Sequence, residues 1–414
     1  MSKLLLPAFL LLTSLCTAND TVNVMFYNIY RFPEKPPANR EFILKDIVNE
    51  FQPDLFMVCE LISESGAERI LNSALQNGSY DFKMAPFVPT LSDTGDPLHQ
   101  TVFYNKRKLM LVQQYTYPTL VRDINRYTFV LNALDLQADS VLVDVFVTHL
   151  KSSEGPENEA LRLTMADTFV RVLQSLPPDR HVLLAGDFNF YSSAEAAYQR
   201  LTDPANNIVM TDPINSPGEW HNNPAFAGVH TQATRTSAEG FGTGGATGGM
   251  DDRFDFVLIS DGLRNNELLR YVEHSYHAFG NNGNCFDQRI DAYDCDGSYD
   301  LPLRRKLHNM SDHAPVVLQL HTNKQFLGIA ANDRNPKIAI AGSNVVHDIL
   351  EIKINQPVPG LVLKVCNNLG QTLKSRKIQS GEKKVAFAVD DLVPGLYYLR
   401  LVAAHTETLK FIRR

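Results

Sequence analysis

The feature that most constrains this chain is a series of apolar segments between residues 22 and 321, in which strand-like and helix-like periods alternate. Valines recur at every second position from 141 to 147, as in a strand, whereas residues 158–176 repeat apolar residues at helical spacing. Some predicted strands follow one another directly, whereas others are separated by a predicted helix. This order predicts an α/β sandwich in which helices cover two sheets. The predicted strands cover residues 22–30, 55–61, 101–105, 127–137, 141–150, 181–185, 253–260 and 315–321.

The end of the chain differs in charge and in pattern. Residues 337–414 contain 12 Lys and Arg against 6 Asp and Glu, a net charge of +6, while the preceding residues contain 27 against 40, a net charge of −13. Residues 323–336 are polar and end in proline, so we expect a linker between domains at 19–322 and 337–414. Short strands separated by Gly and Pro predict a small all-β sandwich for the second domain, at residues 349–354, 361–367, 383–389 and 397–403.

The first 18 residues have the pattern of a secretory signal peptide. Lys3 precedes an apolar run over residues 4–16, and the small residues Thr17 and Ala18 precede Asn19. The run is shorter than the ~20 residues that span a bilayer. We therefore expect export, cleavage after Ala18 and no stable membrane insertion, since no other segment of the sequence could cross a membrane.

Composition excludes several classes of protein. With 44% hydrophobic and 21% charged residues, the chain has the make-up of a globular protein and not of a disordered tail, a collagen or a coiled coil. The formal net charge of −7 argues against a protein that binds nucleic acid through an overall basic surface.

Four cysteines remain after the predicted cleavage. Cys285 and Cys295 lie in a loop rich in Gly, Asn and Asp, with nine residues between them, and an exported protein matures in an oxidising compartment. We predict a disulfide that stiffens this loop; two free surface thiols are the alternative. Cys59 alternates with apolar residues and is expected to be a buried small residue.

Several predicted strands end in an acid, an amide or a histidine where an apolar residue would be expected. Singly, such residues cap turns, and Asp187 with Asn189 could form an Asx turn. Together they indicate a site, because Asp187 and Asn189 point to the same side of an extended chain. The full set is Asn28, Glu60, His149, Asp187 with Asn189, Asp255, and Asp312 with His313.

The chemistry of this set favours a metal-dependent hydrolase. Carboxylate and amide oxygens suit a hard cation such as Mg²⁺, and a histidine beside an acid suits proton transfer. The sequence has no Cys/His pair with zinc spacing, no Gly-x-Ser-x-Gly nucleophile motif and no Gly-x-x-x-x-Gly-Lys phosphate loop. We therefore predict a Mg²⁺-type hydrolase with acid/base histidines that acts on phosphate.

Six motifs carry a resemblance to a known superfamily, in its order and with sensible spacing. They are Val24-Met-Phe-Tyr-Asn28, Pro53-Asp-Leu-Phe-Met-Val-Cys-Glu60, Val147-Thr-His149-Leu-Lys, Gly186-Asp187-Phe-Asn189, Asp252-Arg-Phe-Asp255-Phe-Val-Leu and Ser311-Asp312-His313-Ala-Pro-Val. Residues 21–321 thus resemble the endonuclease/exonuclease/phosphatase superfamily, which has the pancreatic deoxyribonuclease fold. The resemblance implies a four-layer α/β/β/α sandwich, with the site at strand ends between the two sheets.

The resemblance also implies a metal site. Asn28, Glu60 and Asp312 resemble the ligands on the metal side. The cofactor implied is Mg²⁺, with Mn²⁺ or Ca²⁺ able to substitute, and its charge would stabilise the phosphoryl oxygens.

The remaining residues resemble the catalytic groups of the superfamily. Asp187 and Asn189 resemble the pair that orients water and phosphate. His313 resembles the general base, with Asp255 holding its imidazole. His149 resembles the second histidine, which contacts phosphate or protonates the leaving oxygen. The motif His149-Leu-Lys is more similar to the deoxyribonuclease and sphingomyelinase branches than to the repair branch.

The C-terminal part resembles the sorting domain of type IX secretion. Residues 391–401 and 409–414 carry the resemblance, residues 368–371 fit its central turn, and the usual Pro-Asn-Pro opening is replaced by Gly-Ser-Asn at 342–344. The type IX machinery is then a partner and the destination is the cell surface or the exterior. An immunoglobulin-like accessory module that binds substrate or surface is the alternative.

Three functions remain open on the sequence alone. The leading one is an endonuclease, expected to be a monomer, that acts on extracellular DNA or RNA. The net charge of −13 before residue 337 weakens the endonuclease hypothesis, because contacts with phosphate supply much of the affinity for nucleic acid. Basic runs such as 106–108 and 304–306 could still make a local groove positive. A phosphodiesterase or phosphatase acting on a small or lipid phosphate, sphingomyelinase-like, is second, although no long apolar insertion suggests a lipid anchor. A non-catalytic surface-binding protein is third, disfavoured because every expected catalytic position holds a competent residue.

Overall fold

A computed structural model describes residues 21–76, 81–92, 95, 98–136, 140–326, 338–341, 344–354, 362–367, 371–379, 382–402 and 407–414. The chain divides into two compact units, residues 1–327 and 328–414. The predicted signal peptide, most of the predicted linker and residues 368–370 of the turn predicted at 368–371 lie outside the described residues.

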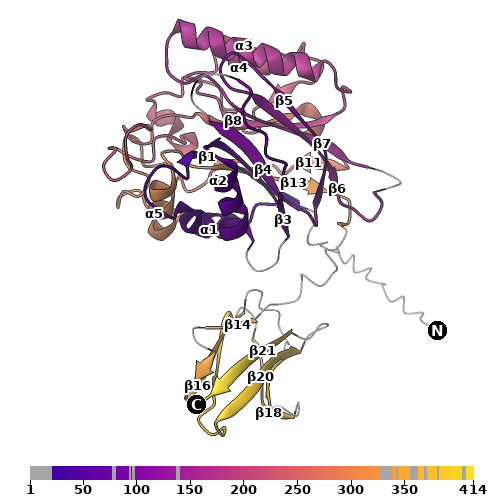
Figure 1. Ribbon diagram of the computed structural model, residues 1–414, viewed down its shortest axis with the longest axis vertical. Coiled ribbons are helices and arrows are strands. Elements are labelled where there is room, and N and C mark those ends of the chain that lie inside the picture. Colours follow the sequence, from indigo (N-terminus) through magenta and orange to yellow (C-terminus); the bar gives the residue numbers. More distant parts are fainter. Residues whose placement is uncertain are drawn as a thin grey trace, which may run out of the picture. The chain divides into compact units, whose positions relative to one another are not determined.

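The larger unit contains two sheets that face each other, β1 contacting β8 and β10 across the interface (Figure 1). The first sheet has the order β11-β13-β1-β2-β4-β3, with β12 also paired to β13, and the second has the order β5-β6-β7-β8-β10-β9. The strands of the first sheet are β1 (Thr21–Phe32), β2 (Leu55–Leu61), β3 (Phe82–Met84), β4 (His99–Asn105), β11 (Leu269–Tyr271), β12 (His277–Ala278) and β13 (Val316–Thr322). Those of the second are β5 (Leu109–Tyr117), β6 (Ile124–Leu131), β7 (Leu142–His149), β8 (His181–Asp187), β9 (Met210–Thr211) and β10 (Asp255–Ser260).

Helices cover the outer face of each sheet, which gives the predicted four-layer sandwich. In Figure 1, α3 and α4 lie on the outer side of the second sheet, and α1, α2 and α5 lie on that of the first. The α-helices are α1 (Arg40–Phe51), α2 (Glu64–Arg69), α3 (Pro156–Leu173), α4 (Ala196–Leu201) and α5 (Leu301–Met310). Shorter turns are the π-helical η1 (Ile70–Leu75) and the 3₁₀ turns η2 (Pro224–Val229) and η3 (Asp261–Leu263).

Alternation along β1 shows how the sequence builds these layers. Met25, Tyr27 and Ile29 belong to the apolar core shared with the helices of the first sheet. Because successive side chains of a strand point to opposite faces, Phe26 and Asn28 point toward the second sheet. Asn28 is therefore carried into the space between the sheets by the period of the strand.

The smaller unit is all β, as the sequence predicts. Its two sheets have the orders β14-β16-β19 and β15-β21-β20-β17-β18. Alternating apolar residues of facing strands, such as Leu350 and Ile352 with Leu363 and Val365, form its core. Its strands are β14 (Ile338–Ile340), β15 (Val345–Val346), β16 (Ile349–Ile354), β17 (Val362–Cys366), β18 (Thr372–Lys377), β19 (Lys384–Ala388), β20 (Gly395–Val402) and β21 (Glu407–Arg413).

The larger unit does not stop at residue 322, where the sequence analysis placed its end. Phe326 is 3% exposed and forms a β-bridge with Ala133, and Lys324 pairs with Asp135 at 2.8 Å. Residues 323–326 are polar enough to be predicted as linker, but one aromatic ring and one ion pair hold them to the larger unit. In the larger unit, β6 ends at Leu131 instead of 137, and the elements that were not predicted from the sequence are β3, β5, β9, β11, β12, α4 and α5.

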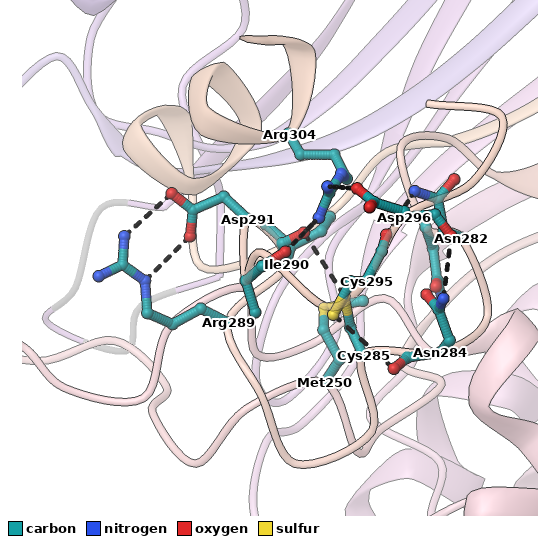
Figure 2. The surroundings of a disulfide bond; sticks show 12 residues. Met250, Asn282, Asn284, Cys285, Arg289, Ile290, Asp291, Cys295, Asp296 and Arg304 are labelled. Atoms are coloured by element: carbon teal, nitrogen blue, oxygen red, sulfur yellow. Dashed lines mark hydrogen bonds and ion pairs between the residues drawn. A yellow bond between two sulfur atoms is a disulfide. The ribbon is translucent and has the colours of Figure 1, made fainter. Parts of the chain in front are cut away.

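The structure contains a disulfide between Cys285 and Cys295 (Figure 2). Both cysteines are buried and belong to the core cluster that includes Met250. Arg304 lies beside the disulfide loop, where it donates to the carbonyl oxygens of Ile290 (2.9 Å) and Ala292 (2.8 Å). Buried sulfur atoms and a buried arginine thus supply the core of a loop that has few apolar side chains.

Among the described residues, no helix combines the length and the apolar character needed to span a membrane.

Candidate active site

Three candidate residues sit side by side on the second sheet. Strands β7 and β8 are parallel with His149 opposite Asp187, and β10 is antiparallel to β8 with Asp255 opposite Asp187. Phe146 and Phe256, which point to the opposite face of the same strands, belong to the apolar core under α3. Because side chains alternate along a strand, His149, Asp187 and Asp255 all face the first sheet. None of the three is more than 4% exposed. Strand register alone therefore places two acids and a histidine in one row.

Asn28 and Glu60 come from neighbouring strands of the first sheet. Asn28 lies opposite Cys59, which is buried as expected. Because Val58 faces the helices, strict alternation would point Glu60 the same way. Instead the register shifts between Val58 and Leu61, and Glu60 adopts a φ of 57°. This bulge turns the Glu60 carboxylate to the site, where its Oε1 accepts from Asn28 Nδ2 at 3.1 Å.

The segment after α5 delivers Asp312 and His313. Ser311 Oγ donates to the carbonyl oxygen of Asn28 at 2.6 Å, which ties this segment to β1. Asp312 Oδ2 accepts from the backbone N–H of Ala246 at 2.5 Å. Ala246 lies in the loop with six glycines at 240–249, so this loop forms a wall of the site.

His313 is the centre of the arrangement. Its Nδ1 lies 2.7 Å from Asp255 Oδ2, and its Nε2 lies 3.3 Å from Asn28 Nδ2 and 3.6 Å from Asp187 Oδ2. The amide nitrogen of Gln232 also lies 2.5 Å from Nε2. Burial lowers the pKa of His313, but Asp255 and Asp187 outweigh burial and raise it well above its usual range. The ring thus has one nitrogen held by a carboxylate and the other directed at the site.

Asp187 is held by residues on both sides. Its Oδ1 accepts from the amide nitrogen of Asn189 at 2.8 Å, and its Oδ2 accepts from Asn28 Nδ2 at 3.0 Å. Burial raises the pKa of Asp187, with His313 opposing the shift. His149 Nε2 lies 3.4 Å from Asp187 Oδ2, and burial lowers the pKa of His149 well below its usual range, so this imidazole is neutral at pH 7.

The donor atoms can accommodate a hard cation. Ligand atoms of Glu60, His149 and Asp187 lie within 4.8 Å of one another. Burial raises the pKa of Glu60, and the nearby Asp312 raises it further. Carboxylates that repel one another in this way bind a divalent cation favourably, because the cation removes the repulsion.

This grouping differs in part from the metal ligands that the sequence analysis proposed. Asn28 touches Glu60, but its amide oxygen accepts from the Tyr30 N–H at 3.0 Å and its nitrogen faces the carboxylates. A half-turn of this amide would bring its oxygen to the carboxylates, as a ligand role requires. Asp312 lies on the same cleft but outside the tight group of Glu60, His149 and Asp187.

The site opens into a cleft of about 490 Å³. It brings together six of the eight candidate residues, and the other two, Asn28 and Asp255, lie directly behind it in contact with His313. Residues that the sequence analysis missed complete the lining: Tyr30, Arg31, Leu98, Arg122, Ser152, Ser153, Tyr191, Gln232, Gly245, Ala246 and Phe254. Tyr30, Arg31 and Tyr191 lie two or three residues after the motif residues Asn28 and Asn189, and this nearness could have identified them. Arg122 and Gln232 lie far from all six motifs.

Backbone strain concentrates around the cleft. Five lining residues that are not glycine have positive φ values: Tyr30 (42°), Arg31 (47°), Glu60 (57°), Ser153 (78°) and Asn189 (53°). Each such residue costs about 1–3 kcal/mol and persists only where its surroundings enforce it. The packing of the sandwich therefore holds the cleft in a conformation that the isolated segments would not adopt.

The two basic runs considered as polyanion-binding patches have structural roles. Lys108 is buried and pairs with Asp54 at 2.6 Å. Arg304 is buried behind the disulfide loop, and Lys306 pairs with Asp46 at 3.0 Å. Neither run lines the cleft, whose cations are Arg31 and Arg122. These runs were only candidate patches, with a solvated charge run as the commoner alternative, and the cleft is lined by neither of them because Lys108 and Lys306 pair with acids of the same domain.

Sequence models of two known families match parts of this chain. Residues 25–313 match the sequence model of the Endonuclease/Exonuclease/phosphatase family, and residues 344–413 match that of the secretion system C-terminal sorting domain. A search of curated proteins found no match.

Solved structures that resemble the chain include three with similar coverage. The human Nocturnin catalytic domain with bound sulfate is 15% identical (TM-score 0.46; 73% of this chain and 95% of that chain). D. rerio TDP2 complexed with single-strand DNA product is 15% identical (TM-score 0.49; 73% and 100%). A family protein from Bacteroides thetaiotaomicron is 14% identical (TM-score 0.46; 73% and 95%).

The family match places this four-layer sandwich among hydrolases of phosphate esters. The chain belongs to the endonuclease/exonuclease/phosphatase family, whose members are divalent-metal-dependent phosphoester hydrolases. Its sorting domain implies export to the cell surface or the exterior.

Proposed function

We propose that this protein is an exported Mg²⁺-dependent phosphodiester hydrolase, and that it acts as an endonuclease on extracellular DNA or RNA. The observation that carries the proposal is the position of His313. Asp255 holds its Nδ1 at 2.7 Å, and its Nε2 faces Asp187 and Asn28 at the base of a cleft lined by acids and arginines.

His313 acts as the general base. With its Nδ1–H donated to Asp255, its Nε2 carries the lone pair that takes a proton from water. Asp187 fixes that water from the other side, because Asn189 orients its carboxylate. A base positioned in this way contributes about 10²–10⁴-fold in rate.

His149 and Arg122 contact the phosphate. The pKa of His149 is too low for it to serve as a protonated acid at neutral pH, so we assign it the role of a neutral N–H donor to a phosphoryl oxygen. Arg122 lines the same cleft and is anchored by its Nη1–H donated to the carbonyl oxygen of Leu150 at 2.9 Å. Its remaining donors suit the fork geometry of a phosphate.

Glu60, Asp312 and Asp187 would hold the cation, with Asn28 joining them after the half-turn of its amide. Mg²⁺ is the best match because the donors are oxygen-rich and lack thiolates. When bound, the cation would stabilise negative charge on the phosphoryl oxygens.

The cleft supports a nucleic-acid substrate because it combines cations with an aromatic ring. Arg31 and Arg122 can contact phosphates, while the partly exposed Tyr191 offers its ring to a base or sugar. The alternative is a small or lipid phosphate ester. It is favoured by the net charge of −13 in the first 336 residues and by the loss of both basic runs to internal ion pairs.

The proposed partners follow from the two domains. The sorting domain would engage the type IX secretion machinery, and the catalytic domain would act as a monomer. Export would begin with the signal peptide at residues 1–18.

The test is to incubate the purified protein with DNA, RNA, sphingomyelin and a phosphomonoester, each with Mg²⁺. Internal cleavage of DNA or RNA at rates well above the other substrates supports the proposal. Faster hydrolysis of sphingomyelin or of the monoester supports the alternative, and no hydrolysis of any substrate supports a binding protein on this scaffold.

A further inference from the structure

Arg162 is a fully buried residue of α3 that the site analysis leaves without a role. Its Nε donates to Glu195 Oε2 at 2.8 Å, and its Nη1 donates to the carbonyl oxygens of Lys151 (3.0 Å) and Ser153 (2.9 Å). A single guanidinium therefore joins α3 to two segments that are far apart in the sequence.

The first of these segments forms one wall of the cleft. Residues 150–155 connect His149 to α3, and Ser152 and Ser153 line the cleft. Ser153 has a φ of 78°, a conformation that a serine adopts only when its surroundings enforce it. The bond from Arg162 to the Ser153 carbonyl supplies that constraint.

The second segment forms the wall beside the first. Glu195 uses its other oxygen, Oε1, to accept from the backbone N–H of Tyr191 at 2.8 Å. Tyr191 lines the cleft, and the Arg162 guanidinium lies 5.8 Å from the centre of its ring. Arg162 and Glu195 thus form a buried connection between the Tyr191 wall and the Ser152–Ser153 wall.

We propose that Arg162 is a positioning residue that holds both walls in register and thereby sets the affinity of the cleft for the groups attached to the scissile phosphate. The proposal rests on the proposed phosphodiesterase function. Arg162 touches neither Asp255 nor His313, so its loss should weaken binding of large substrates and leave the chemical step in place.

The test compares Arg162→Lys with the parent on two substrates, a single-stranded oligonucleotide and bis(p-nitrophenyl) phosphate. Lysine keeps a positive charge beside Glu195 but lacks the planar fork by which Arg162 donates to Glu195 through Nε and to the two carbonyls through Nη1. We expect KM for the oligonucleotide to rise about 10- to 100-fold, while kcat for the small diester stays within about twofold. The matched control is Arg126→Lys, because Arg126 pairs with Asp144 at 2.9 Å in a buried site that does not line the cleft.

A second readout separates this proposal from the proposed function. Hydrogen exchange of the full-length protein should become faster in peptides that contain Tyr191 in Arg162→Lys, but not in Arg126→Lys, because the Tyr191 N–H depends on Glu195. This outcome would support the positioning role even if the parent hydrolysed no diester. If Arg162→Lys does not fold, the double variant Arg162→Met with Glu195→Met removes both buried charges together and takes its place. Unchanged exchange at Tyr191, or equal kinetic losses for both substrates, would overturn the proposal.

Discussion

Asp255 Oδ2 lies 2.7 Å from His313 Nδ1, although 58 residues separate the two in the sequence. Asp255 begins β10 on the second sheet, and His313 follows α5 and precedes β13 on the first sheet. The contact thus bridges the two sheets at the site. It fixes which nitrogen of His313 holds the proton and directs the other nitrogen to the cleft.

Asp255→Asn should shift the pH profile of kcat/KM and lower its height. The Asp255 carboxylate is one of the charges that raise the pKa of His313, and His313 must be neutral to act as a base. Without that charge the pKa falls, so the acid limb should move to lower pH, while the maximum rate should drop at least about 100-fold. The measurement is kcat/KM from pH 5 to 10 at saturating Mg²⁺. An acid limb that stays in place would show that His313 is not the base.

The same pair should make stability depend on pH. The folded-state pKa of His313 lies above 6.5, so its contribution to the free energy of unfolding is complete below pH 6.5 and is lost as the pH rises through the folded pKa. Urea denaturation in the presence of chelator, at several pH values, should show this loss in the parent and a weaker loss in Asp255→Asn. Parallel curves for the two proteins would contradict the prediction.

Chelation should abolish turnover, and added Mg²⁺ should restore it. Glu60 is half-buried and Asp187 is buried, both have raised pKa values, and a bound cation would relieve the repulsion between their charges. The measurement is activity after EDTA treatment and dialysis, with Mg²⁺, Mn²⁺ or Ca²⁺ added back. Full activity in excess chelator would exclude a catalytic metal.

His149→Ala and His313→Ala should each remove most activity and leave a folded protein of lower stability. From the sequence, both histidines are predicted to lie in loops or at strand ends, but His149 and His313 are only 4% and 2% exposed. Leaving Asp255 without its partner costs about 1–3 kcal/mol. Fluorescence of the single Trp220 would follow unfolding, and the exposed His347→Ala would serve as control. Parental rates in either variant would refute the role of that histidine.

Replacing Cys285 and Cys295 with alanine should lower the free energy of unfolding by about 2–4 kcal/mol. The disulfide closes a loop whose buried members support the core beside Met250 (Figure 2). Because neither cysteine lines the cleft, KM and kcat should change little when assayed well below the melting temperature. A large loss of activity without loss of stability would assign the loop a role in substrate binding.

Removal of the second unit should leave catalysis intact only if the cut preserves Phe326. A chain ending at Leu327 keeps the Phe326 ring, which is buried and lies 5.8 Å from Lys108 Nζ. A chain ending at Asn323 should be less stable by about 1.5–3 kcal/mol, the value of one buried aromatic side chain. Turnover and denaturation of both truncations test this point.

In the native host, the chain ending at Leu327 should accumulate in the periplasm while the full-length protein reaches the exterior, because residues 344–413 carry the sorting domain. Cell fractionation of both proteins is the measurement. Equal export would show that this domain has another role.

The sequence was sufficient to predict the layers and most of the site, because strand period and motif order are local properties. Strands β1, β7, β8 and β10 contain Asn28, His149, Asp187 and Asp255, so the alternation that buries the core also directs these four side chains to the site. The all-β structure of the C-terminal unit could also be predicted, because its short strands and the Gly and Pro residues between them are visible in short stretches of sequence.

Only the tertiary structure decided the remaining features. Glu60 faces the cleft because a bulge in β2 reverses the direction that alternation predicts, and the bulge is stable only between its neighbouring strands. The basic runs that looked available for phosphate are used in ion pairs with acids distant in sequence. Gln232 and Arg162 belong to no motif and gain their positions from partners on other elements. Such contacts depend on how the elements pack against one another, and that information is not contained in any local stretch of the sequence.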